Sequence, residues 1–105
     1  MIIAKVVGAA VASIKLDALK ASKLLAVCPT DAQGNAIGVA FLAVDLVGAG
    51  DGELVVVSQG SSARIAIGPQ GTSPADAAII GILDSISYHG AESRRSSGEV
   101  AFRKD

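Results

Sequence analysis

The amino-terminal segment, residues 2–14, constrains the fold more than any other part of the sequence. Its even positions are all apolar or glycine: Ile2, Ala4, Val6, Gly8, Ala10, Ala12 and Ile14. A repeat of two residues is typical of a β-strand, whose successive side chains point to opposite faces of a sheet. Gly8 in the middle of the segment predicts a β-bulge or a tight bend, such as the strands of a barrel use.

More strand-like segments follow at short intervals. They are residues 23–30, 36–47, 54–57 and 79–88, with 99–103 as a last short strand. Residues 31–35 separate the first two with turn residues, and Gly34 can adopt a positive φ there, so 23–47 is predicted to form a β-hairpin. The apolar run at 54–57 is typical of a strand buried on both faces.

Helical signals are few and short. Gly60 and the residues up to Arg64 predict a tight turn into a short helix, and residues 65–72 are expected to form a loop. Ser73 followed by Pro74 and an acid at Asp76 predicts the start of a second short helix. A chain with many short strands and few helices is expected to be mainly β, as a barrel or a sandwich.

The long strands are apolar on both faces, although antiparallel strands usually keep one polar face. The surplus apolar residues on the two segments are Val7, Ala9 and Val11 on the first, and Val39, Phe41 and Ala43 on the second. A domain this small has one interior, so an additional apolar face needs a second partner. The sequence therefore predicts an obligate homo-oligomer.

Composition excludes several classes of function. The 105 residues form one expected domain, 1–105, and carry a net charge of −1 with only three aromatic residues. A nucleic-acid binder needs a basic groove and stacking aromatic side chains. One cysteine and one histidine do not make a zinc site of the usual type.

The sequence also bears on location. Lys5 interrupts the first apolar run, and no apolar run approaches the length of about 20 residues that a membrane-spanning helix needs. The chain is therefore expected to be cytoplasmic, with no membrane partner.

The order and spacing of these segments resemble the EutN/CcmL family of microcompartment vertex proteins. Four stretches carry the resemblance and cover nearly the whole chain up to residue 86: IIAKVVGAAVAS, KLLAV with DAQGN, AVDLVGAGDGELVVVSQGSSAR and SPADAAIIGILDSI. The resemblance implies an OB-like five-stranded β-barrel with one or two short helices that assembles as a cyclic homopentamer. It further implies a structural protein rather than an enzyme, with no cofactor, that fills the vertices of a polyhedral shell between hexameric shell proteins. A narrow opening would run along the fivefold axis.

The glycine-rich residues 48–53 are the first candidate site. They resemble a phosphate-binding loop, but Glu53 stands where the dinucleotide fingerprint has its third glycine, and a strand follows instead of a helix. A plain glycine turn is the alternative. In that case Asp51 and Glu53 are candidates for charged contacts between subunits.

The turn formed by Gly60, Ser61 and Ser62 is the second candidate site. Its backbone N–H groups and hydroxyls could converge before the helix, which favours anions. In a ring, one such turn from each subunit is predicted to line a polar pore. An ordinary serine cap is the alternative. Arg64 is predicted either to pair with an acid of a neighbouring subunit or to lie in solvent.

Three further aspartates are candidate functional residues. Asp45 and Asp84 lie in apolar segments, where a carboxylate needs partners, so they are predicted to hold an interface or a turn. Paired acids also perform general acid–base catalysis, but no nucleophile or base accompanies them. Asp76 is expected to help cap the second helix.

The carboxyl-terminal end carries the last predicted contacts. The basic end is predicted either to lie in solvent or to dock on the neighbouring subunit or on a hexamer edge. Residues 99–103, EVAFR, favour docking, because a short strand can add to an exposed sheet edge, and this would place Val100 and Phe102 at a subunit interface. Two alternatives to a shell protein stay open at this point. They are an OB-fold nucleic-acid-binding module and a small enzyme or nucleotide binder that uses residues 48–52.

Overall fold

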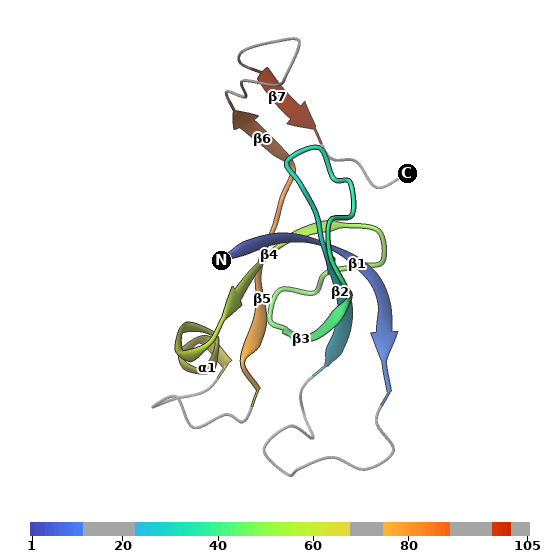
Figure 1. Cartoon of the computed structure of the whole chain (residues 1–105). Helices are drawn as coiled ribbons and strands as arrows, with labels where there is room; N and C mark the ends of the chain where they lie inside the picture. The colour runs from blue at the N-terminus through green and yellow to red at the C-terminus, as the bar shows by residue number, and fades with distance from the viewer. Residues whose placement is uncertain (12–22, 68–74, 89–97, 102–105) are drawn as a thin grey trace.

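Five strands close into a barrel in the order β1, β2, β3, β5, β4 in the computed structural model (Figure 1). The structure describes residues 1–11, 23–67, 75–88 and 98–101. The barrel strands are β1 Ile2–Ala10, β2 Leu24–Pro29, β3 Phe41–Asp45, β4 Leu54–Gln59 and β5 Ala77–Ile82. All neighbours run antiparallel except β3 and β5, which are parallel. The predicted mainly-β barrel of five strands is confirmed, and its closure pairs every barrel strand on both sides.

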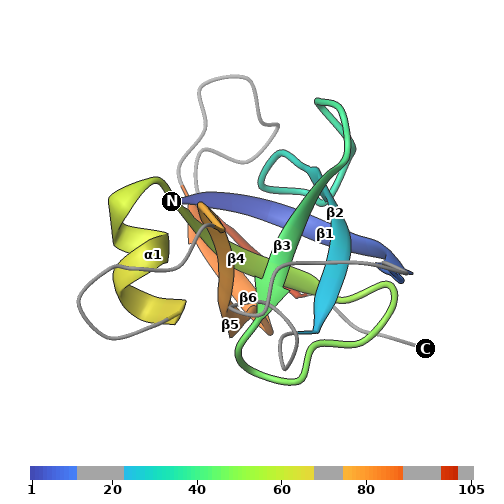
Figure 2. The ribbon, with the colours of Figure 1, turned by 90° about the horizontal axis from the view of Figure 1, so that it is seen from below.

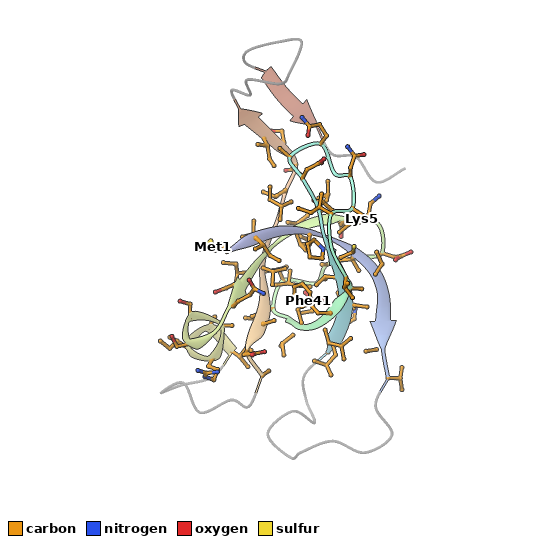
Figure 3. All side chains as sticks on the ribbon, viewed as in Figure 1. Met1, Lys5 and Phe41 are labelled. Atoms are coloured by element: carbon orange, nitrogen blue, oxygen red, sulfur yellow. The ribbon has the colours of Figure 1, made fainter. Side chains whose placement is uncertain are left out.

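The barrel interior is filled by small aliphatic side chains. The largest fully buried ones are Ile79, Val6, Val27, Val44, Val55 and Val57. Phe41 packs against the core cluster from β3, whereas Lys5 points away from the barrel on β1 (Figure 3). Burying apolar area of this kind is the main stabilising contribution to such a fold, at about 25 cal/mol per Å².

The alternation predicted for the first strand is present in β1. Ala4 and Val6 are buried, while Lys5, Val7 and Ala9 are exposed. The pairing with β2 shifts between Val6 and Gly8, which is the irregularity that the glycine predicted. Residues 12–14 of the predicted strand lie outside the described residues.

The predicted hairpin at 23–47 forms, but its second strand is shorter than expected. The β3 strand begins at Phe41, and residues 36–40 are not part of it, apart from a single bridge between Ala36 and Thr30. The preceding strand ends at Pro29, which has no N–H to donate to a ladder, although its carbonyl accepts from the Ile37 N–H at 2.9 Å. The apolar alternation of residues 36–40 therefore has no continuous partner strand.

Helix α1, Ser61–Ile67, follows Gly60, which adopts a φ of 67°. The tight turn into a helix is confirmed, and the helix extends through three of the residues expected to form a loop. The second helix was wrong for its described residues, because Ala75 and Asp76 are not helical and lead directly into β5. The Gly60 N–H donates to the Asp76 carbonyl at 2.8 Å, and Gln59 pairs with Ala77, so sheet pairing overrides the local helix signal.

A second, two-stranded sheet follows the barrel. The predicted strand at 79–88 is broken at Leu83 and Asp84 into β5 and β6, Ser85–Tyr88, and β6 pairs with β7, Gly98–Ala101. This hairpin projects beyond one end of the barrel (Figure 1). The view from below shows the five barrel strands encircling the interior, with α1 on one side (Figure 2).

Candidate functional site

The outer surface of the barrel exposes several large apolar side chains. Val7 lies at the β1 bulge and is 49% exposed, and Val11 just beyond β1 is 95% exposed. On β3 the predicted outward face was wrong in part, because Ala43 is buried and Phe41 packs against the core, and Leu42 faces outward in their place. Phe41 and Ala43 share one face and Leu42 points to the other, because successive residues of a strand point to opposite sides.

Further apolar side chains are exposed outside β1 and β3. They are Ile37 and Val39 before β3, Leu46 and Val47 after it, Ile65 on α1 and Ile82 at the end of β5. Of these, Val39 is the one that the sequence had placed on the outward apolar face. An apolar surface of this kind is typical of a protein–protein contact.

The loop at residues 46–53 is shaped by Asp45 at the end of β3. Its Oδ1 accepts hydrogen bonds from the N–H groups of Val47, Gly48 and Ala49 at 3.1, 3.1 and 3.2 Å, and its Oδ2 accepts a second one from Ala49 at 3.1 Å. Of the predicted alternatives for Asp45, the turn is therefore the one that the structure shows. An acidic side chain that accepts hydrogen bonds from several backbone N–H groups fixes a loop strongly. Charge-assisted hydrogen bonds are stronger than those between neutral groups.

The same loop is closed from its other end by Glu53. Its Oε1 accepts from the Gly50 N–H at 2.5 Å, while the Gly52 N–H donates to the Val6 carbonyl at 2.9 Å. Gly48 and Gly52 adopt φ values of 77° and 83°, which a side chain disfavours. The amide groups that a phosphate would need thus already have carboxylate acceptors. The interpretation as a glycine turn is favoured, and Asp51 is exposed at its tip.

The turn formed by Gly60, Ser61 and Ser62 lies where β4 passes into α1. Ser61 and Ser62 are exposed, and Ala63 is completely buried and anchors the helix on the barrel. Arg64 is half-buried, and its N–H donates to the Gly60 carbonyl at 3.2 Å. The three candidate pore residues therefore share one solvent-facing turn. Their place in a ring stays a prediction.

A second carboxylate turn stands in the β2–β3 connection. Asp31 Oδ1 accepts from the N–H groups of Gln33 and Asn35, both at 2.9 Å. The bond from the Asn35 backbone is the largest of the effects that lower the pKa of Asp31 below its ordinary value. Gly34 completes the turn with a φ of 88°, as its sequence predicted.

The remaining predicted residues are scattered. Asp76 is exposed and contacts the Gly60 turn through its backbone carbonyl, so its predicted role as a helix cap was wrong. Asp84 is exposed in the bend between β5 and β6, apart from Asp45. Val100 lies in β7, and Phe102 lies outside the described residues.

Two other kinds of site are absent from the described residues. Residues 1–11, 23–67, 75–88 and 98–101 hold no group of three or more histidine, cysteine, aspartate or glutamate side chains placed to bind a metal ion. Among these same residues, none of the helices has the length and apolar character to cross a membrane. Cys28 is half-buried and directs its Sγ to the Gly38 carbonyl at 3.3 Å.

The chain is similar to proteins of known role over nearly its whole length. It is 40% identical to the microcompartment shell vertex protein EutN of Escherichia coli over 104 residues, which cover 99% of this chain and 100% of EutN. It is also 40% identical to the carboxysome shell vertex protein CcmL of Synechocystis over 87 residues, which cover 83% of this chain and 86% of CcmL.

Solved structures of shell proteins have the same fold as this chain. An ethanolamine utilisation protein EutN superposes with a TM-score of 0.76 at 43% identity, covering 82% of this chain and 88% of that one. The pentameric shell protein GrpN of Rhodospirillum rubrum superposes with a TM-score of 0.71 at 43% identity, covering 80% of this chain and 94% of GrpN. The family model described as "Ethanolamine utilisation protein EutN/carboxysome" matches residues 1–84, which include the whole barrel, and this chain therefore belongs to the EutN/CcmL family.

Proposed function

We propose that this chain is a structural subunit that forms a cyclic pentamer and caps the vertices of a polyhedral bacterial microcompartment, within whose shell it resides. The observation that carries the proposal is the similarity to a shell vertex protein across 99% of this chain and 100% of the relative. The family consists of shell proteins, so the chain acts by assembly and not by catalysis or nucleic-acid binding. Residues 1–105 would together form one vertex domain.

The barrel supports this role physically. Its interior is filled, so the apolar side chains that remain on its outer surface gain nothing from the fold of a single copy. A head-to-tail contact repeated around an axis buries such a surface on every subunit and closes a ring. A flat layer of hexagonal tiles cannot close into a polyhedron without pentagonal corners. We therefore propose hexameric shell proteins as the partners around the pentamer.

Specific residues are proposed for two surfaces of the ring. Gly60, Ser61 and Ser62 would line a polar opening on the axis, which their shared exposed turn supports. The proposed interface residues are Asp51, Glu53, Arg64, Val100 and Phe102. Replacing Ser62 by phenylalanine should leave the ring intact and narrow its opening in an electron cryomicroscopy map. Loss of the ring would instead assign the turn to an interface or a cap.

The vertex role is tested by complementation. In a microcompartment-forming bacterium that lacks its own vertex gene, expression of this chain should restore closed polyhedral shells, seen by electron microscopy. Val55→Asp, which places a charge at a completely buried core position, is the control that should leave the shells open. A soluble, pentameric wild-type chain that fails to close shells would contradict the vertex role.

A further inference from the structure

The loop between β3 and β4, residues 46–53, has to cross the barrel, because β5 lies between the two strands that it connects. The loop is visible in Figure 2 as the lime-green segment that runs from β3 round to β4. Ala49 at its centre is only 3% exposed and belongs to the hydrophobic core cluster. The loop is thus anchored in the barrel at its middle and does not stand free of it.

The loop satisfies its own polar backbone. Four successive N–H groups, from residues 47 to 50, all donate to the carboxylates of Asp45 and Glu53. Polar groups usually resist burial in a contact because an unpaired N–H loses its bond to water. A loop whose N–H groups are already paired can be covered by another protein surface without that loss.

The loop presents two apolar side chains to solvent at its start, while Asp51 is exposed at its tip. Leu46 and Val47 are 42% and 40% exposed, directly after Asp45. The loop is also joined to the exposed part of β1, because the Gly52 N–H donates to the Val6 carbonyl and the Val6 N–H donates to the Glu53 carbonyl. The next residue along β1 is Val7, half-exposed at the bulge, so the far end of the loop is fixed beside the bulge of β1.

We propose that the surface made by Leu46 and Val47 packs against a second copy of this chain, and that Asp45 positions it. The inference rests on the proposed pentamer and names the element by which its subunits meet. Glu53 also acts within its own loop, where its Oε1 accepts from the Gly50 N–H.

A second copy fits this surface better than other occupants do. Solved relatives of the chain are pentameric, so copies of such a barrel cover one another's surfaces. The two carboxylates beneath the loop would repel the phosphates of a nucleic acid. The contact offered is apolar with satisfied polar groups, which is the composition of the buried centre of a subunit interface.

The test is the concentration at which the ring dissociates, measured by native mass spectrometry on the full chain at a series of dilutions. Val47→Arg should raise that concentration by at least about tenfold, since truncating or charging a central interface residue has effects of that size. Val47→Ala should raise it less. Gln33→Arg, an equal charge on the exposed turn at 31–35, is the control and should leave it unchanged. Circular dichroism checks that each variant keeps its strands.

The positioning role of Asp45 has its own readout. Asp45→Asn keeps the size of the side chain but replaces one acceptor oxygen by an NH₂ group, and should also raise the dissociation concentration by about tenfold. If Asp45 acts by holding the loop in place, the double variant Asp45→Asn/Val47→Arg should have nearly the same dissociation concentration as Val47→Arg alone. The effects of mutations at coupled residues are not additive. A purely structural role for Asp45 would give additive effects on dissociation.

The outcomes separate the two proposals. A wild-type chain that is monomeric at all concentrations would overturn the pentamer, and this inference with it. A pentameric wild type together with an equally stable Val47→Arg ring would overturn the inference alone. That result would assign the loop to another partner and leave the vertex role standing.

Discussion

The barrel and the β6–β7 hairpin are built on opposite principles. Each barrel strand is paired on both sides and buries one face in a shared core, whereas β6 and β7 pair with each other beyond the end of the barrel (Figure 1). The family match covers residues 1–84 and ends just before β6 begins at Ser85. An isolated two-stranded hairpin is marginally stable in water. The shared barrel can therefore stand by itself, whereas the hairpin depends on the surface that it contacts.

Shortening one isoleucine in each region tests whether the barrel and the hairpin contribute differently to stability. Ile79→Ala removes a completely buried side chain of β5 and should lower the free energy of unfolding by about 3 kcal/mol. Ile86→Ala in β6, where the side chain is half-buried, should cost less than about 1 kcal/mol. Urea denaturation at equal protein concentration measures both. Equal losses would show that the hairpin is as tightly integrated as the core.

A smaller effect is expected at the turn that joins the barrel to α1. Gly60→Ala places a side chain on a residue with a φ of 67° and should destabilise the chain by about 1–2 kcal/mol. Gly8→Ala is the matched control, because an added Cβ there also meets no atom within 4 Å and the φ is not positive. Thermal unfolding compares the two variants. A Gly8→Ala variant that is as unstable as Gly60→Ala would remove the conformational explanation.

Removing the hairpin tests the comparison directly. A chain that ends at Asp84 should keep its far-ultraviolet circular dichroism and lose only a few degrees of Tm, because it keeps all five barrel strands. Deletion of residues 98–105 alone should weaken the ring or its incorporation into shells, as a docking role for the last strand requires. An unfolded 1–84 chain would contradict the independence of the barrel, and a truncated chain that caps shells normally would contradict the docking role.

The smallest expected effect concerns the turn at residues 31–35. The pKa of Asp31 is lowered by its hydrogen bonds, so the turn is fully stabilised above the ordinary pKa of an aspartate and loses this contribution as the pH falls through the lowered pKa. Because the carboxylate is exposed, only the local turn should respond. The amide resonances of Gln33 and Asn35 in an NMR titration report this change. In Asp31→Asn both resonances should become insensitive to pH in this range.

The sequence predicted the regular parts of this fold well. The two-residue alternation around Ala4 and Val6 identified β1 and its inner face, and Gly8 identified the bulge. The turn chemistry around Gly34 identified the β2–β3 hairpin. These signals are local, because they depend on backbone conformations and side-chain directions that neighbouring residues set.

The errors arose where pairing partners decide the structure. Residues 36–40 alternate like a strand, yet their neighbours are Pro29 and the end of β2, which offer no ladder. The sequence around Asp76 has the signature of a helix start, yet Ala77 pairs with Gln59 in the barrel. Neither partner can be identified from residues close in sequence.

The candidate site was predicted in outline and not in detail. An excess of outward apolar side chains was foreseen, but Leu42, Leu46 and Val47 were not assigned to it. Asp45 was expected to hold an interface or a turn, and the structure shows its four hydrogen bonds within the turn. Which face of a short strand points outward depends on register, and a shift of one residue reverses it.

The central claim is that a single copy leaves an apolar outer surface that only neighbouring copies cover. Native mass spectrometry of the purified full chain at low micromolar concentration tests it most directly. We expect a species with the mass of five chains as the main form. A chain that is monomeric under these conditions, or a ring of another number, would contradict it.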